Sequence, residues 1–122
     1  MSTSVQGTVT VTHCDNNGTW LVALQGEHDL ATEPLLKQQT DSIWPHCNIA
    51  VIDLSEADFI SSSVIRWLLG VERELEAHDA FTFSVVEGPP DSVAARTLGL
   101  FGARELLACY PTRRAALAQA PT

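Results

Sequence analysis

The segment DFISSSVIRWLLG, residues 58–70, places three consecutive serines between an apolar strand-like run and an apolar helix-like run. The first turn of a helix leaves about four backbone N–H groups unpaired, and a serine just before it can accept a hydrogen bond from one of them, which typically stabilises by about 1 kcal/mol. Ser61 or Ser62 suits this role. One serine is enough for capping, so a cluster of three directs attention to other chemistry of the hydroxyl group.

Phosphorylation is one such chemistry. A helix N-terminus carries a partial positive charge and free N–H donors, so it would hold a phosphate without unfolding the domain. The phosphate would add a charge of roughly −1.5 to −2 at the end of a strand, where α/β proteins present binding surfaces. Binding at this place could then be switched off. Because Ser61, Ser62 and Ser63 lie within one helical turn, their spacing does not select one of them.

Nucleophilic catalysis is the other chemistry, and it needs a base. Of the four histidines, only His28, which follows a predicted strand, is a candidate partner for Ser62. A lone histidine in a loop is far more often solvated than catalytic, and the sequence contains no GxSxG, GxGxxG, Walker or HExxH pattern. We therefore expect a protein without catalytic residues and keep a serine hydrolase as a remote alternative.

The cysteines do not indicate a metal centre or a disulfide framework. Cys14, Cys47 and Cys109 are odd in number, widely spaced and without a CxxC pairing. Two His-Cys pairs, at 13–14 and 46–47, are poor ligand sets, because sequence neighbours on a strand point to opposite faces and because the second pair follows a proline in a predicted loop. We expect reduced, packed thiols, no metal and no cofactor.

The elements around the serines alternate between strands and helices. The helix after the serines is amphipathic: at 100° per residue its apolar residues share one broad face, while Arg66, Gly70 and Arg73 lie opposite, so it should cover a sheet. The run 48–54 is almost wholly apolar, as is typical of a strand buried on both faces. The apolar helix face comprises Val64, Ile65, Leu68, Leu69, Val71 and Leu75.

The whole chain predicts the order β-β-α-β-α-β-α-β-α. This order indicates an α/β fold with a mixed sheet of four to five strands, the first antiparallel, and about four helices. The predicted strands are 5–12, 20–24, 48–54, 81–86 and 106–109, and the predicted helices run from Thr32 to about Ile43, from the serines onward, from Ser92 to Leu98 with a stop at Gly99, and from Pro111 to about Gln119.

Size and charge limit the classes of function. The 122 residues suit one domain spanning 1–122, with no apolar run near the roughly 18 residues of a membrane span and no secretion signal, so we expect a cytoplasmic protein without membrane insertion. The formal net charge is −8 and the basic residues are scattered, which disfavours direct nucleic-acid binding. An acidic surface suits solubility and docking to a basic partner.

Three separated segments resemble the STAS domain family of bacterial anti-sigma factor antagonists. VIDLSEADFISSSVIRWLLG is similar to the family's strand ending in D-L-S, followed by an apolar pair, Asp-Ser-Ser-Gly and an amphipathic helix. VALQGEHDLATEPLLKQQ resembles the second strand with its L-x-G-E-L-D-x-x-T turn, and VAARTLGLFGARELLACYPTRRAALA resembles the closing segment. The resemblance covers about residues 5–119, with Ser61 and Val64 in place of the signature's aspartate and glycine.

The resemblance implies a binding module rather than an enzyme. In the family's partner switching, the dephosphorylated domain binds an anti-sigma factor, usually an ATP-dependent serine kinase, and so frees a sigma factor. The kinase phosphorylates the first serine of the signature pair, which is Ser62 here, with Ser63 as the second. A phosphatase resets the switch. The turn aspartate that lies beside the phosphorylation site in relatives falls at Asp29.

The predicted partner-binding surface combines the turn, the serine loop and the start of the following helix. Arg66, on the polar face of that helix, is a candidate to pair with an acidic group of the partner. Trp67, on the helix flank, is either a buried aromatic residue or an exposed docking anchor. The full predicted set is Asp29, Phe59, Ser61, Ser62, Ser63, Arg66 and Trp67.

The resemblance also leaves an alternative within binding proteins. The chain could be a STAS subunit that is never phosphorylated, for example in an ABC transporter of the lipid type or in a signalling complex. The sequence does not choose between a monomer and a weak dimer.

Overall fold

The computed structural model describes residues 7–14, 18–77 and 82–118. The predicted strand residues 5–6 and 81 and the predicted helix end at Gln119 lie outside these residues. The strands are β1 (Thr8–His13), β2 (Thr19–His28), β3 (Ile49–Asp53), β4 (Ala57–Ile60), β5 (Thr82–Val86) and β6 (Cys109–Tyr110), and the α-helices are α1 (Glu33–Thr40), α2 (Ser62–Ala77), α3 (Val93–Leu100) and α4 (Arg113–Ala118).

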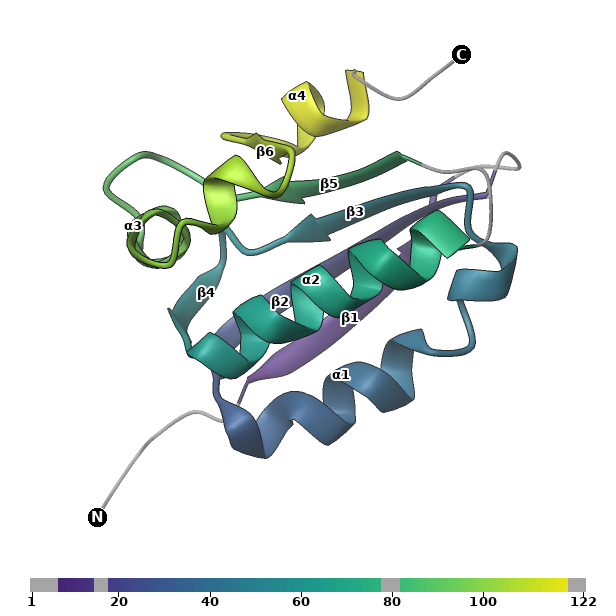
Figure 1. Ribbon diagram of the computed structural model, residues 1–122, viewed down its shortest axis with the longest axis horizontal. Helices are drawn as coiled ribbons and strands as arrows, with labels where there is room; N and C mark the ends of the chain where they lie inside the picture. The colour runs from purple at the N-terminus through teal and green to yellow at the C-terminus, as the bar shows by residue number, and fades with distance from the viewer. Residues whose placement is uncertain (1–6, 15–17, 78–81, 119–122) are drawn as a thin grey trace.

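The sheet is mixed, as predicted. Its main path runs β1-β2-β3-β5-β6; β1 and β2 form an antiparallel hairpin, and the remaining pairs are parallel (Figure 1). Val22 of β2 lies opposite Val11 of β1 and Ile52 of β3, which fixes the register of the central strands. The expected α/β class, the antiparallel first pair and the four α-helices are therefore confirmed.

The short strand β4 was not predicted, and it pairs with the end of β2 outside the main path. β2 extends to His28, well past the predicted end at Leu24, because it changes partner along its length. Its first half pairs with β3, whereas Gly26 to His28 pair with β4. Gly26 has a φ of 81°, a backbone conformation that glycine adopts readily, and the register shifts at this point.

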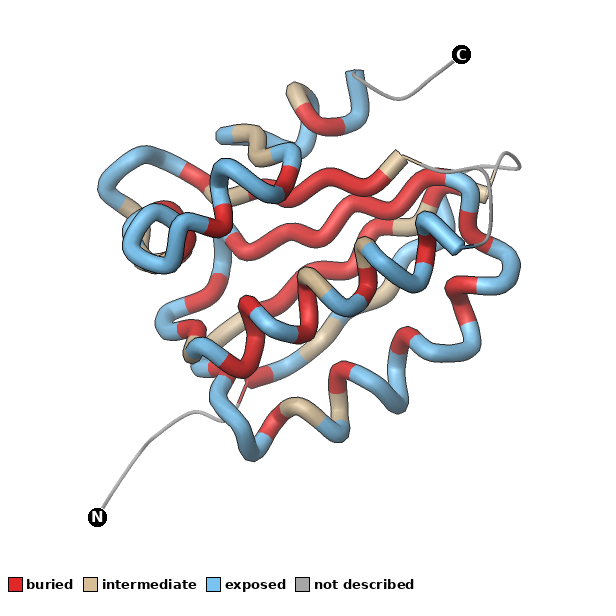
Figure 2. Tube along the Cα trace, in the orientation of Figure 1, coloured by how far each residue is buried: buried red, intermediate tan, exposed pale blue. Residues whose placement is uncertain are grey.

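The helices cover the two faces of the sheet unequally. Residues of α1, α2 and α3 pack on one face in a large apolar cluster that includes Leu36, Leu68 and Leu98. Ala116 of α4 packs on the other face with a smaller cluster from β2, β3 and β5. All five residues of β3 are buried, which confirms the strand predicted to be buried on both faces (Figure 2).

Helix α2 shows the predicted amphipathic pattern. Val64, Leu68 and Leu75 are at most 1% exposed, while Arg66 and Gly70 are exposed. Burying aliphatic side chains of this size contributes about 1.5–3 kcal/mol each, so packing against the sheet fixes the orientation of the helix. The start of α2 is thereby held at the end of β4, where the serines lie (Figure 1).

Helix ends differ from the predictions at two places. Helix α3 begins at Val93, next to the predicted start at Ser92, and Ser92 caps it, because its Oγ accepts a hydrogen bond from the Ala95 N–H at 3.2 Å. The helix then continues past Gly99 to Leu100, and the left-handed residue after it is Gly102, with a φ of 67°. Helix α1 ends at Thr40, three residues before the predicted end at about Ile43, and a separate 3₁₀ turn, Trp44–His46, follows.

Candidate functional site

The serine loop is tied to the end of β2 by its backbone. The Ser61 N–H donates to the His28 carbonyl at 3.0 Å, and the Ser61 carbonyl accepts from the Val64 N–H at 3.0 Å. Ser61 is therefore the residue from which α2 begins, and Ser62 is the first helical residue. The partner exchange of β2 thus places Asp29, the residue after its end, beside the start of α2.

The three serine hydroxyls lie in different environments. Ser63 is 7% exposed, and its Oγ lies 2.6 Å from the Oγ of half-buried Ser61, so these two hydroxyls form a hydrogen bond with each other. Ser62 is exposed, and its hydroxyl has no hydrogen bond to any residue in the described ranges. Ser62 is the serine that presents a free hydroxyl to solvent.

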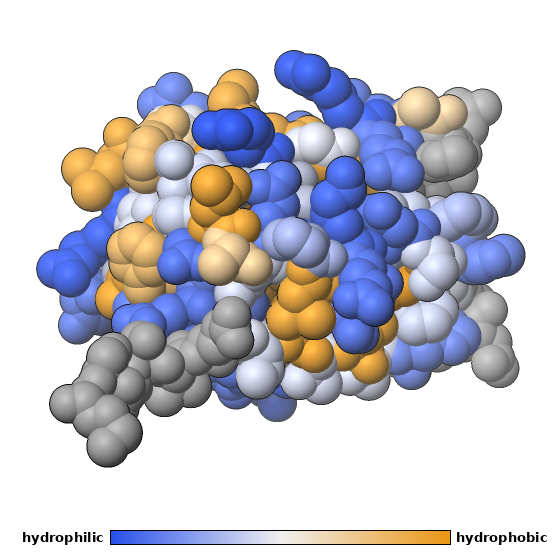
Figure 3. All heavy atoms as spheres, turned by 90° about the horizontal axis from the view of Figure 1, so that it is seen from below, coloured by the Kyte–Doolittle hydropathy of each residue, from blue (hydrophilic) through white to orange (hydrophobic). Residues whose placement is uncertain are grey.

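An open depression of about 480 Å³ surrounds Ser62. Leu30 and Phe59, which are 67% and 47% exposed, supply apolar side chains to its wall. Figure 3 shows apolar groups among polar ones at the end of the molecule where β4 lies. The lining comprises Asp29, Leu30, Phe59, Ser61, Ser62, Ser63 and Arg66, so the structure brings six of the seven predicted residues together and adds Leu30.

Leu30 was missed because its exposure depends on local backbone geometry. It begins a short 3₁₀ helix, Leu30–Thr32, that follows β2. The Asp29 carboxylate caps this helix by accepting a hydrogen bond from the Ala31 N–H at 2.9 Å. Leu30 is the first residue of this capped turn, and its side chain lies on the surface. Asp29 therefore both shapes the turn and contributes negative charge to the depression.

Comparison with known proteins identifies the architecture. The family model described as STAS domain matches residues 11–116. The chain belongs to the STAS domain family. A search of curated proteins finds no match for this chain.

Solved structures of anti-sigma factor antagonists share this STAS fold. One from Mycobacterium paratuberculosis is 28% identical, covers 94% of each chain and has a TM-score of 0.82. SpoIIAA in its unphosphorylated form is 17% identical over 92% of this chain and 95% of its own, with a TM-score of 0.71. The phosphorylated form of Bacillus SpoIIAA, also 17% identical, covers 92% and 98% of the two chains with a TM-score of 0.68.

Val64, which replaces the signature's glycine, points into the core of this STAS domain. It is 1% exposed and belongs to the large apolar cluster under α2. Its bulk is therefore absent from the surface around Ser62. Ser61, which replaces the signature's aspartate, is also partly enclosed and bonded to Ser63.

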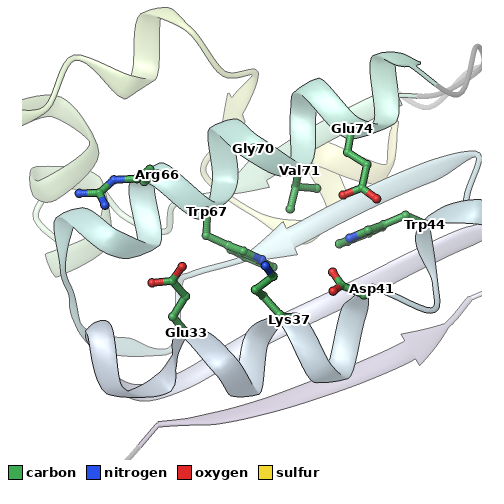
Figure 4. Close-up of a pocket in the computed structure, with 9 residues that line it drawn as sticks. All are labelled: Glu33, Lys37, Asp41, Trp44, Arg66, Trp67, Gly70, Val71 and Glu74. Atoms are coloured by element: carbon green, nitrogen blue, oxygen red, sulfur yellow. The ribbon is translucent and has the colours of Figure 1, made fainter.

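Of the two alternatives for Trp67, the buried aromatic residue is confirmed and the exposed docking anchor is wrong. Trp67 is 9% exposed and does not line the depression. It projects between α1 and α2, in a groove of about 230 Å³ that it shares with Trp44 and Val71 (Figure 4). The helical angle placed Trp67 correctly on the flank of α2, but its burial depends on where α1 packs, and that tertiary contact has no signal in the sequence.

The alternative of a serine hydrolase is contradicted by His28. Its side chain is fully buried rather than solvated. Its Nε2 donates towards the Gln25 carbonyl at 3.0 Å and the Thr8 carbonyl at 3.2 Å. Its Nδ1 lies 3.1 Å from Thr32 Oγ1. The imidazole is therefore committed to structural hydrogen bonds and is not available to take a proton from Ser62.

An ion pair between a buried aspartate and a partly exposed arginine at the end of β3 was missed by sequence reasoning. Asp53 is 1% exposed; one carboxylate oxygen accepts from the Ser55 N–H at 2.8 Å, and the other pairs with the guanidinium of Arg113 on α4. The hydrogen bond to Asp53 raises the pKa of Arg113 above its usual value, and burial opposes this. The two residues are 60 positions apart, so no local pattern could have linked them.

Cys14, Cys47 and Cys109, all among the described residues, form no disulfide with one another. Burial is the main cause that raises the pKa of Cys47 to about 11 and that of Cys109 to about 11, so both remain protonated at neutral pH. Cys14 is exposed, contrary to the expectation that all three are packed. Within the described residues, no group of three or more histidine, cysteine or acidic side chains could hold a metal ion, and no helix could span a membrane.

Proposed function

We propose that this STAS domain is an anti-sigma factor antagonist that binds an anti-sigma factor through the depression around Ser62 and is switched off by phosphorylation of Ser62. The observation that carries the proposal is the free, exposed hydroxyl of Ser62 at the first position of α2. It lies within a depression that also presents exposed Leu30 and Phe59.

The chemistry of the depression supports both states of the switch. In the unmodified state, Leu30 and Phe59 offer apolar surface whose burial favours association. A phosphate on Ser62 would place roughly two negative charges among them, and a partner would have to desolvate that group in order to dock. The backbone N–H groups at the start of α2 are suited to hold the phosphate, so the fold would tolerate the modification.

The similar proteins support the same proposal. The structure from Mycobacterium paratuberculosis, which is 28% identical, is an anti-sigma factor antagonist. SpoIIAA, which is similar in fold, has been solved in unphosphorylated and phosphorylated forms. By this resemblance, the partner is an anti-sigma factor with serine kinase activity, and a phosphatase restores the active state.

The proposal is tested by binding measurements with purified candidate anti-sigma factors from the same genome. Ser62→Asp should weaken binding by tenfold or more, which corresponds to about 1.4 kcal/mol of binding free energy. This exceeds the effect of about 1 kcal/mol that a change of helix cap has on stability. Ser62→Ala should bind within threefold of the wild type. Ala77→Asp adds the same charge at an exposed site at the far end of α2 and is the matched control.

Incubation with the binding partner and ATP completes the test. Intact mass and site mapping should find one phosphoryl group, located on Ser62. Equal affinity of wild type and Ser62→Asp would remove phosphorylation control and favour a permanently unmodified STAS subunit. Failure to bind any of the anti-sigma factors, together with capture of a transporter ATPase in a pull-down, would overturn the proposed partner.

A further inference from the structure

Arg66 lies one turn after Ser62 on the same helix. Residues four positions apart in an α-helix are neighbours on its surface, and both side chains line the depression. Arg66 also lines the groove between α1 and α2, where Glu33 is found. The guanidinium group therefore lies at the boundary between the two concave regions.

The orientation of Arg66 favours the serine side. Figure 4 shows its guanidinium group directed away from Trp67 and towards the start of α2. This is the direction in which long side chains of a helix lean, back over the preceding turn. Arg66 is exposed and forms no ion pair with a described residue, whereas Arg104 and Arg113 pair with Glu87 and Asp53. Its charge is thus free to bind an anion that arrives.

We propose that Arg66 binds the phosphate of phosphorylated Ser62 in an ion pair across the first turn of α2. This inference rests on the proposed function in one respect, namely that Ser62 is the modified serine. An acidic group four residues before a basic one is the favourable order in a helix, because it also suits the helix dipole. The planar guanidinium group can donate two parallel hydrogen bonds to phosphate oxygens, which a lysine cannot do.

The ion pair would change the depression in two ways at once. Phosphorylation would add negative charge at Ser62 and would also engage Arg66, the cation available there to an acidic group of a partner. The other arginine on α2, Arg73, lies 11 residues after Ser62, which is about 16 Å along the helix axis, so it is too distant for direct contact. The effect should therefore be specific to Arg66.

The test installs phosphoserine at position 62 by genetic encoding, so that neither a kinase nor a partner is needed. The pH at which the phosphate takes up its second proton is then measured by phosphorus NMR. With Arg66 present, this midpoint should lie about half a pH unit lower than in Arg66→Gln, because the cation favours the dianion. Arg66→Lys should retain part of the shift. Arg73→Gln, with the same loss of charge on the same helix, should leave the midpoint unchanged.

The outcomes separate this inference from the proposed function. Identical midpoints in the wild type, Arg66→Gln and Arg73→Gln would overturn the role of Arg66, and the binding measurements on Ser62→Asp would be unaffected. Equal shifts for both glutamine variants would also overturn it, because they would indicate only the general field of the protein. A shift confined to Arg66→Gln supports the ion pair even if Ser62→Asp fails to weaken partner binding, in which case the proposed function falls alone.

Discussion

The carboxyl ends of β3 and β4 both lead to a polar side chain with an arginine on a nearby helix, yet the two ends differ in their exposure. At the end of β3, Asp53 is 1% exposed and both of its oxygens are used, one of them by Arg113. After β4, Ser62 is exposed and its hydroxyl is not bonded to any described residue. Arg66, four residues later, is likewise without an ion pair among the described residues.

The difference distinguishes a strand end whose polar groups stabilise the packing from one where an exposed hydroxyl is open to modification. A buried carboxylate is tolerated only with partners, so the end of β3 is committed to holding α4 on the sheet. A solvated hydroxyl needs no partner, so it can gain a charge without loss of the native packing. Under the proposed function, regulation is therefore expected at the end where Ser62 and Arg66 have no partner among the described residues, and stability at the end where Asp53 is paired with Arg113.

The largest expected contrast is between the two arginines. Arg113→Met would leave the buried Asp53 carboxylate without its cation and should lower the free energy of unfolding by about 2–3 kcal/mol, less than for a fully buried pair because Arg113 is 44% exposed. Arg66→Met should change it by no more than about 0.5 kcal/mol. Urea unfolding of both variants measures the difference. Equal decreases in the free energy of unfolding would show that the ends of β3 and β4 do not differ in their contribution to stability.

The sequence predicted the end of β4, where Ser62 is exposed, better than the end of β3, where Asp53 is buried. The serines and the amphipathic start of α2 are contiguous, and the resemblance to the STAS signature supplied Asp29 and Phe59 as neighbours. The choice of Ser62 as the free hydroxyl needed the structure, because the 2.6 Å bond between Ser61 and Ser63 depends on side-chain orientation. The local sequence pattern identifies the serine segment, and the side-chain geometry shows which of its hydroxyl groups is unbonded.

The features that were missed all depend on contacts between distant segments. The strand β4 has only four residues and a buried-exposed-exposed-buried pattern, so it lacks the alternation that marks a strand. It forms because Gly26 lets β2 bend towards it. The burial of Trp67 depends on α1, and the pairing of Asp53 with Arg113 joins residues 60 positions apart. Periodicity carries no information about such pairings.

A second variant tests whether the serine loop is supported by the apolar packing beneath it. Val64→Ala removes two buried carbon atoms beneath the serine loop and should lower the free energy of unfolding by about 2 kcal/mol, from lost burial and the cavity left behind. Chemical denaturation gives this value. Partner affinity measured well below the unfolding midpoint should stay within threefold of the wild type, because the side chain is absent from the surface. A large loss of affinity would place Val64 in the binding surface instead of under it.

The smallest expected contrast lies within the serine cluster itself. Ser63→Ala leaves the half-buried Ser61 hydroxyl without its partner and should lower the free energy of unfolding by about 1 kcal/mol. Ser62→Ala removes an exposed hydroxyl with no bond to a described residue, so it should change stability by at most about 0.5 kcal/mol. Parallel thermal and urea unfolding of the two variants resolves this difference. If Ser62→Ala proved the more destabilising variant, the Ser62 hydroxyl would be a structural cap. The distinction between polar groups that stabilise the fold and an unbonded hydroxyl that is open to modification would then fail at Ser62 itself.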